Sequence, residues 1–165
     1  MPSERFVDAL NAQITREFNA SHQYTAVGAY YAAETYPQLA KFFYEQADEE
    51  RGHALKMVDY LLDTNSPITF AGIEPPRSDF EDHIAPIRLA LEQEQSVTVA
   101  ISELVEIARE TRDFRSEQFL DWFLAEQTEE ESSLSDLLAV AERTASVPML
   151  LEEYLAREVP GHRAS

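Results

Sequence analysis

The run Asp48-Glu49-Glu50-Arg51-Gly52-His53 interrupts the apolar face of a long helical pattern with a carboxylate and an imidazole. Steps of three and four residues through this run pass Leu39, Phe43, Gln46, Glu50, His53, Met57 and Tyr60. Such steps place side chains on one face of an α-helix. Glu50 and His53 therefore occupy positions where buried Leu or Val is expected. Burying ionisable groups together is costly unless another charge compensates them, and a metal ion would do so.

Three other stretches show the same apolar steps with a polar interruption near the middle. The interruptions are Glu17 with Tyr24, then Glu94, and finally Gln127 with Glu130. Each stretch is long enough for a helix of nearly thirty residues. We expect long helices at about 4–34, 38–64, 82–111 and 114–143, and a short one at 147–158. The sequence thus predicts one all-α domain over 1–165.

The connections decide how these helices are arranged. Pro37 ends the first helix and is tolerated in the first turn of the second, and Asp113 can cap the fourth. The only long loop, 65–78, contains Pro67, Gly72, Pro75 and Pro76. A loop of this length can span a bundle, so we expect a four-helix bundle with one long crossover and parallel second and third helices.

The sequence also indicates where the third helix begins and where the fifth helix ends. Ser78-Asp79-Phe80-Glu81 has the spacing of a capping box before the third helix, although Pro86 favours a later start. The fifth helix should end near Val159-Pro160-Gly161. Its apolar residues are expected to be exposed on the single subunit, and therefore to pack at a subunit junction; they are Leu150, Leu151, Tyr154 and Leu155.

Composition excludes several classes of protein. The chain has no Cys, so it has neither disulfides nor thiolate metal sites. Its formal net charge of −18 argues against nucleic acid as a partner. No stretch approaches the ~18 apolar residues of a membrane span, and the first residues show no apolar leader. We therefore expect a cytoplasmic protein with no membrane partner.

The four interruptions should converge, because bundled helices of similar length bring their midpoints to one level. They combine four carboxylates, one imidazole and one amide, a donor set that suits iron or manganese. The alternative is a metal-free set of buried polar residues that fixes helix register. Carboxylates alone would repel one another, so a metal is favoured. Tyr24 on its own is also compatible with a core role.

A second acidic group lies next to these residues in the sequence. It consists of Glu49, Glu126, Glu129, Glu130 and Glu131. The group is compatible with a further cation site and, for Glu131 above all, with a solvated helix face. Trp122 precedes Glu126 by one helical turn, and a single Trp at such a position is usually a packing residue.

These residues together resemble the ferritin family, in particular haem-free bacterial ferritins and their actinobacterial relatives, some named bacterioferritin B. The resemblance spans essentially the whole chain. It rests on Glu17 with Tyr24, the motif Glu50-Arg51-Gly52-His53, Glu94 within Glu92-Gln93-Glu94-Gln95, and the segment from Trp122 to Glu131.

The resemblance implies a specific function for each of these residues. Glu17, Glu50 and His53 would hold one iron of a ferroxidase centre, and Glu50 would bridge to a second iron held by Glu94 with Gln127 and Glu130 nearby. Glu49, Glu126, Glu129 and Glu130 would form a third iron site. Tyr24 and Trp122 would take part in iron oxidation and electron supply. The family builds a twenty-four-subunit homo-oligomeric shell that oxidises ferrous iron with dioxygen and stores ferric mineral.

Departures from related families are equally informative. Haem-binding bacterioferritins carry a second Glu-x-x-His on the fourth helix, where this chain has Gln127-Thr128-Glu129-Glu130, and a haem-ligating Met where this chain has Arg51. We therefore expect no haem. A four-helix di-metal oxidoreductase that handles peroxide without storing iron remains the alternative function.

Overall fold

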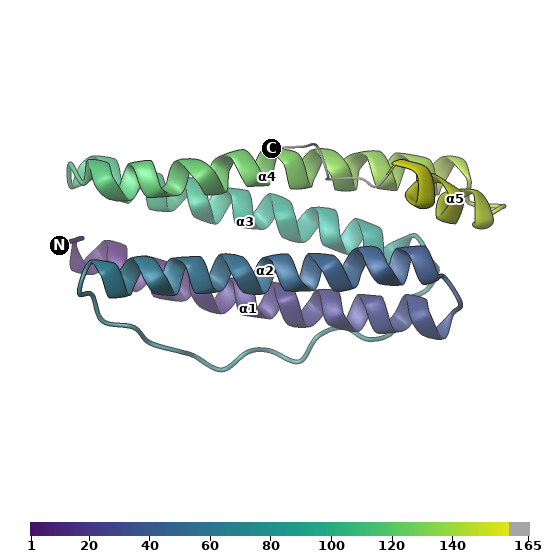
Figure 1. Cartoon of the computed structure of the whole chain (residues 1–165), viewed down its shortest axis with the longest axis horizontal. Coiled ribbons are helices and arrows are strands. Elements are labelled where there is room, and N and C mark those ends of the chain that lie inside the picture. Colours follow the sequence, from purple (N-terminus) through teal and green to yellow (C-terminus); the bar gives the residue numbers. More distant parts are fainter. Residues whose placement is uncertain (159–165) are drawn as a thin grey trace.

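The computed structural model describes residues 1–158, which form five α-helices (Figure 1). The helices are α1 (Glu4–Ala33), α2 (Pro37–Asp63), α3 (Ala85–Glu110), α4 (Phe114–Arg143) and α5 (Met149–Glu158). No strand occurs within this described part of the chain. The all-α prediction of a four-helix bundle with a short fifth helix is confirmed. The expected end of the fifth helix near Val159 lies outside the described residues.

Local chemistry explains where the long helices begin and end. The side chains of Ser3 and Asp113 accept hydrogen bonds from Phe6 N and Ser116 N, both at 3.1 Å, at the starts of α1 and α4. The first three helices end at residues with left-handed backbone angles, namely Thr35, Asn65 and Arg112, with φ of 63°, 53° and 55°. This conformation ends a helix by turning its last carbonyls toward following N–H groups.

Helix α3 begins at Ala85, three residues after the expected bound of 82 and in the direction that Pro86 indicated, and Asp82 organises its start. Asp82 Oδ1 accepts hydrogen bonds from the N–H groups of Ile84 and Ala85 at 2.9 and 2.8 Å. The expected capping box at Ser78 does not form a helix start. Pro86 then occupies the first turn of α3, where its missing N–H costs nothing.

The long crossover runs the length of the bundle beside α1, so α2 and α3 point the same way (Figure 1). Amide side chains of α1 hold it in place by accepting backbone hydrogen bonds. These run from Thr69 N to Asn11, from Glu74 N to Asn19 and from Arg77 N to Gln23, at 2.8, 2.8 and 2.9 Å.

Helix α5 packs on α2 and α4 of its own subunit. Leu151 and Leu155 are buried there, which corrects the expectation that all four of its large apolar residues are exposed. Leu150 is exposed and Tyr154 is half-buried. The sequence pattern marks an apolar helix face correctly but does not say that the same chain covers it.

The hydrophobic core is divided into two clusters, one at each end of the bundle. One cluster includes Tyr24, Phe43, Ile87 and Leu137, and the other includes Leu10, Met57, Ile101 and Leu120. Between them lies a layer of buried polar side chains, here called the polar layer, which consists of Glu17, Glu50, His53, Glu94, Gln127 and Glu130. Among residues 1–158, no helix is both long and apolar enough to cross a bilayer.

Candidate metal centre

The polar layer draws at least one side chain from each of the four long helices. Glu17 comes from α1, Glu50 and His53 from α2, Glu94 from α3, and Gln127 and Glu130 from α4. All six are at most 6% exposed to solvent. Each long helix thus contributes at least one buried polar side chain to the core, as the sequence interruptions indicated.

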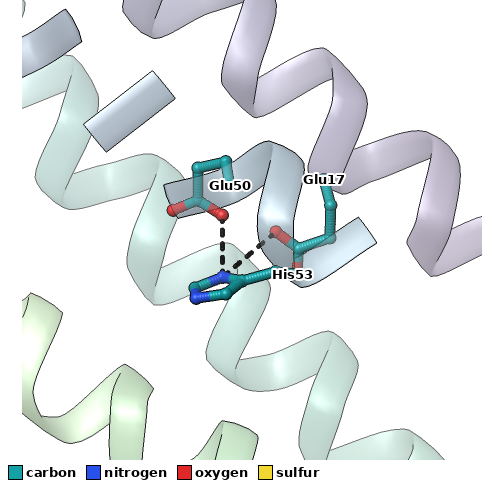
Figure 2. A group of neighbouring side chains, drawn as sticks. All are labelled: Glu17, Glu50 and His53. Atoms are coloured by element: carbon teal, nitrogen blue, oxygen red, sulfur yellow. Dashed lines mark hydrogen bonds and ion pairs between the residues drawn. The ribbon is translucent and has the colours of Figure 1, made fainter. Parts of the chain in front are cut away.

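Glu17, Glu50 and His53 form the first potential metal-binding group (Figure 2). Their potential ligand atoms lie within 4.8 Å of one another. His53 Nδ1 is 3.2 Å from Glu50 Oε2 and 3.9 Å from Glu17 Oε2. The spacing of three residues between Glu50 and His53 places both on one face of α2, and α1 brings Glu17 to the same point.

Glu50, Glu94 and Glu130 form a second group within the same 4.8 Å limit. Glu94 is held by two neighbours. The Tyr24 hydroxyl donates to its Oε1 at 2.5 Å, and Gln127 Nε2 donates to its Oε2 at 3.0 Å. Glu50 thus belongs to both groups, and its two oxygens are available to different partners.

Several carboxylate oxygens of the polar layer have no hydrogen-bond partner among the described residues. They are Glu17 Oε2, Glu50 Oε1 and both oxygens of Glu130. Buried polar atoms without partners are rare, because each costs roughly 1–3 kcal/mol. Divalent cations held by the two groups would satisfy them. The donor set, rich in carboxylate oxygen with one imidazole, therefore fits ferrous iron.

The electrostatics of the layer point the same way. Burial raises the pKa of Glu50 well above its ordinary value, and the charges of Glu94, Glu17 and Glu130 raise it further. Burial likewise raises the pKa of Glu130, followed by the effect of Glu94. The pKa of Tyr24 is also raised, first by burial and then by Glu94. Negative charge is crowded here, and a cation would relieve the crowding.

The second acidic group lies beside the polar layer. His53, Glu126 and Glu130 form a third potential metal-binding group, with His53 Nε2 at 4.0 Å from an oxygen of each carboxylate. Glu49 is half-buried and contributes to the raised pKa of Glu130, while Glu129 is exposed. Glu131 instead accepts a hydrogen bond from the Thr98 hydroxyl at 2.6 Å.

The two aromatic candidates contact the polar layer in different ways. Tyr24 is buried and hydrogen-bonded to Glu94, as described above. Trp122 is 40% exposed, and its ring centroid lies 5.4 Å from that of His53. The ammonium group of Lys56 lies 3.3 Å from the centre of the Trp122 ring, a cation–π contact.

One buried polar residue of the site was missed by the sequence analysis. Gln13 lies one turn before Glu17 on α1 and donates a hydrogen bond from Nε2 to Glu17 Oε1 at 3.0 Å. Its position, one helical turn before a predicted ligand, was the available signal. The sequence pattern gave only Glu17 and Tyr24 as the interruptions in this helix.

Comparison with known proteins gives consistent results. A family model described as "Ferritin-like domain" matches residues 7–144. Ferritin BfrB of Mycobacterium tuberculosis is 41% identical over 158 residues, covering 96% of this chain and 87% of that protein. A bacterial non-heme ferritin of Staphylococcus aureus is 41% identical over 132 residues, covering 80% of each. The structure of an open pore ferritin from Archaeoglobus fulgidus aligns with a TM-score of 0.90 at 30% identity, over 94% of this chain and 97% of that one.

Proposed function

This chain belongs to the ferritin family, and we propose that it is a subunit of an iron-storage shell that oxidises ferrous iron with dioxygen inside each bundle. The single observation that carries this proposal is the polar layer, with four buried carboxylate oxygens that lack hydrogen-bond partners within residues 1–158. Such an arrangement is unfavourable in a purely structural core and favourable around bound cations.

Two ferrous ions are the substrates. We assign Glu17, Glu50 and His53 to the first and Glu50, Glu94 and Glu130 to the second, with Gln127 alongside. The membership of Glu50 in both potential metal-binding groups supports its assignment as the bridge. The imidazole supplies a neutral donor, and the carboxylates supply the negative charge.

The chemistry needs two metals close together with room for dioxygen. Each ferrous ion gives up one electron, and the two electrons together with two protons convert dioxygen to hydrogen peroxide. The carboxylates favour the ferric product by neutralising its added charge. Their lability then allows the ferric ions to leave toward a mineral cavity enclosed by the shell.

Residues outside the layer complete the proposal. Tyr24, hydrogen-bonded to Glu94, and Trp122, in contact with His53, are assigned a part in iron oxidation as neighbours of the metal ligands. Glu49, Glu126, Glu129 and Glu130 are assigned to a third iron site. The position of His53 between Glu130, Glu126 and the first group supports passage of ions between these sites.

We propose that the shell binds no haem, because Arg51 and Gln127-Thr128-Glu129-Glu130 replace the residues that would hold it. Protein expressed with added haem precursors should show no Soret band after purification. A stoichiometric Soret band would contradict this part of the proposal and direct attention to Met57 and Met149.

Iron loading tests the function as a whole. Iron-free protein is given ferrous iron aerobically in a large excess over three ions per subunit, and the iron retained after desalting is counted. A storage shell retains far more iron than its sites can hold and shows a dense core by electron microscopy. Retention of two or three ions per subunit, with rapid turnover of peroxide, would favour a non-storage di-metal oxidoreductase instead.

A further inference from the structure

Gln13 is a fully buried amide whose two polar atoms both have partners. Its side chain is 0% exposed. Nε2 donates to Glu17 Oε1 at 3.0 Å, and Oε1 accepts from Nη1 of Arg16 at 3.1 Å. All three residues lie on α1, separated by three and four positions, so a single helix aligns them.

The direction of this chain of hydrogen bonds is fixed by chemistry. A guanidinium group only donates, so the amide oxygen of Gln13 must face Arg16. The amide nitrogen must then face Glu17, which accepts as a carboxylate. Turning the amide over would place two donors together on one side and two acceptors together on the other. Arg16, at the surface, therefore determines how the buried amide points.

The two oxygens of Glu17 are consequently in different situations. Oε1 accepts the hydrogen bond from Gln13, whereas Oε2 has no hydrogen-bond partner among the described residues and lies 3.9 Å from His53 Nδ1. We propose that Gln13, oriented by Arg16, is a positioning residue that holds Glu17 as a one-oxygen metal ligand and aims Oε2 at the first metal. This inference rests on the proposed function, which supplies the metal.

The effect should be confined to the first potential metal-binding group. Glu94, in the second group, is held by Tyr24 and Gln127 and does not depend on Gln13. Outer contacts that orient a metal ligand typically change metal affinity by about 10–100-fold. Without Gln13, Glu17 is free to rotate and to bind through both oxygens, which raises the coordination number of the metal.

Cobalt(II) is the probe, because its visible absorption reports both binding and coordination number. The full-length protein is freed of metal and titrated anaerobically with cobalt(II) as wild type, Gln13→Met, Arg16→Met and Gln46→Met. Gln46 is the matched control, since it also precedes a proposed ligand (Glu50) by one turn, is 8% exposed and makes no hydrogen bond to that ligand within the described chain.

We expect wild type and Gln46→Met to bind cobalt(II) alike. Gln13→Met should bind the first ion about 10–100-fold more weakly, with weaker visible bands as the coordination number rises, and should keep the second site. Arg16→Met should weaken the first cobalt(II) affinity and the visible bands in the same direction, but less than Gln13→Met does. It tests the inference even if Gln13→Met fails to fold.

Three outcomes would overturn the inference. If Gln13→Met or Arg16→Met has the cobalt(II) affinity and the visible spectrum of wild type, Glu17 needs no positioning. Equal losses in Gln46→Met would show that packing near the layer, and not the hydrogen bond, is responsible. Failure of the wild type to bind two cobalt(II) ions per subunit would remove the proposed function itself, and this result is distinguishable from the other two.

Discussion

Two carboxylates of the polar layer that look alike in sequence differ in their surroundings. Glu94 occupies a position between Leu91 and Ile101 that favours Leu on packing grounds, which suggests a charge left uncompensated without metal. In the structure its oxygens accept from Tyr24 and Gln127. Glu130 has no hydrogen-bond partner for either oxygen among residues 1–158. Glu130 is therefore the carboxyl group that lacks hydrogen-bond partners without metal, and Glu94 is not.

The same substitution should change the stability of the metal-free protein in opposite directions at these two positions. Glu130→Leu should raise the free energy of unfolding by about 1–3 kcal/mol, because it removes a buried carboxyl group that has no hydrogen-bond partner among residues 1–158. Glu94→Leu should lower it by about 1–3 kcal/mol, because it leaves the Tyr24 hydroxyl and the Gln127 amide unpaired. Both should lose fast ferrous oxidation.

Denaturation in chelator, at one fixed protein concentration, measures both changes. Wild type in the same chelator is the reference. Destabilisation by Glu130→Leu of the same size as by Glu94→Leu would mean that Glu130 has a structural partner in solution. Unchanged iron oxidation in Glu94→Leu would remove Glu94 from the proposed second iron site.

Glu50 should make the metal-free protein less stable as the pH rises. Its folded-state pKa lies well above the ordinary value of 4.5, mainly because it is buried. A raised pKa means that the folded state binds the proton more tightly than the unfolded chain does. The stability from this proton is fully present below about pH 4.5 and is lost as pH rises through the raised pKa.

Glu50→Gln, which cannot titrate, provides the comparison. Thermal unfolding of the chelated proteins between pH 5 and pH 8 should show a steeper loss of stability in wild type than in Glu50→Gln. The other carboxylates remain in both proteins, so the difference between the two curves is assigned to Glu50 together with its interactions with Glu94, Glu17 and Glu130. Parallel curves would indicate that the pKa of Glu50 is not raised in solution.

At the scale of whole helices, α5 is joined to α2 by a buried carboxylate. Glu152 accepts hydrogen bonds from Gln38 N at 3.0 Å and Leu39 N at 2.8 Å. These N–H groups lie in the first turn of α2, whose own N-cap residue, Tyr36, makes no side-chain capping bond. Glu152 therefore caps a helix from a different part of the chain, where a negative charge is also favoured by the helix dipole.

Glu152→Ala should lower the free energy of unfolding by about 0.5–2 kcal/mol, as for loss of other helix caps. Hydrogen exchange should become faster in the first turn of α2 and in α5 together. Glu153→Ala, at the exposed neighbouring position, is the control and should change neither measurement. Faster exchange in α5 alone would show that the carboxylate does not cap α2.

Helices α2 and α5 differ in how much of their structure could be predicted from the sequence. Repeated apolar steps identify the four long helices, and the interruptions in those steps identify the polar layer, because both depend on spacing within one helix. The burial of Leu151, the cap from Glu152 and the hydrogen bonds from Ile84 N and Ala85 N to Asp82 depend on contacts between elements or on local turns. Such contacts leave no periodic pattern, so the sequence analysis missed them.

The whole molecule is expected to be an assembly. Exposed apolar residues remain around α5, where Val147, Met149 and Leu150 are 47%, 74% and 47% exposed. We expect sedimentation to show one closed species of twenty-four subunits. Each subunit has a net charge of −18, so assembly should be favoured as salt shortens the screening length to ~8 Å at physiological ionic strength.

Sedimentation in low and in physiological salt gives the measurement. Leu150→Glu places a charge on the exposed apolar surface around α5 and should shift the population toward smaller species. A monodisperse monomer or dimer of the wild type in both salts would contradict the shell. An assembly that weakens as salt rises would show that ion pairs between subunits outweigh their repulsion.

The division of the core into two clusters has a mechanical consequence. A helical bundle ordinarily frays from its ends, where few contacts hold the last turns. Here each end is closed by its own apolar cluster, so we expect the weakest plane of the metal-free bundle to lie at mid-length, in the polar layer between the two clusters. Iron bound as proposed would link the four long helices across that plane. The subunit should therefore be stiffest while it carries its substrate and should soften in the middle each time the substrate departs.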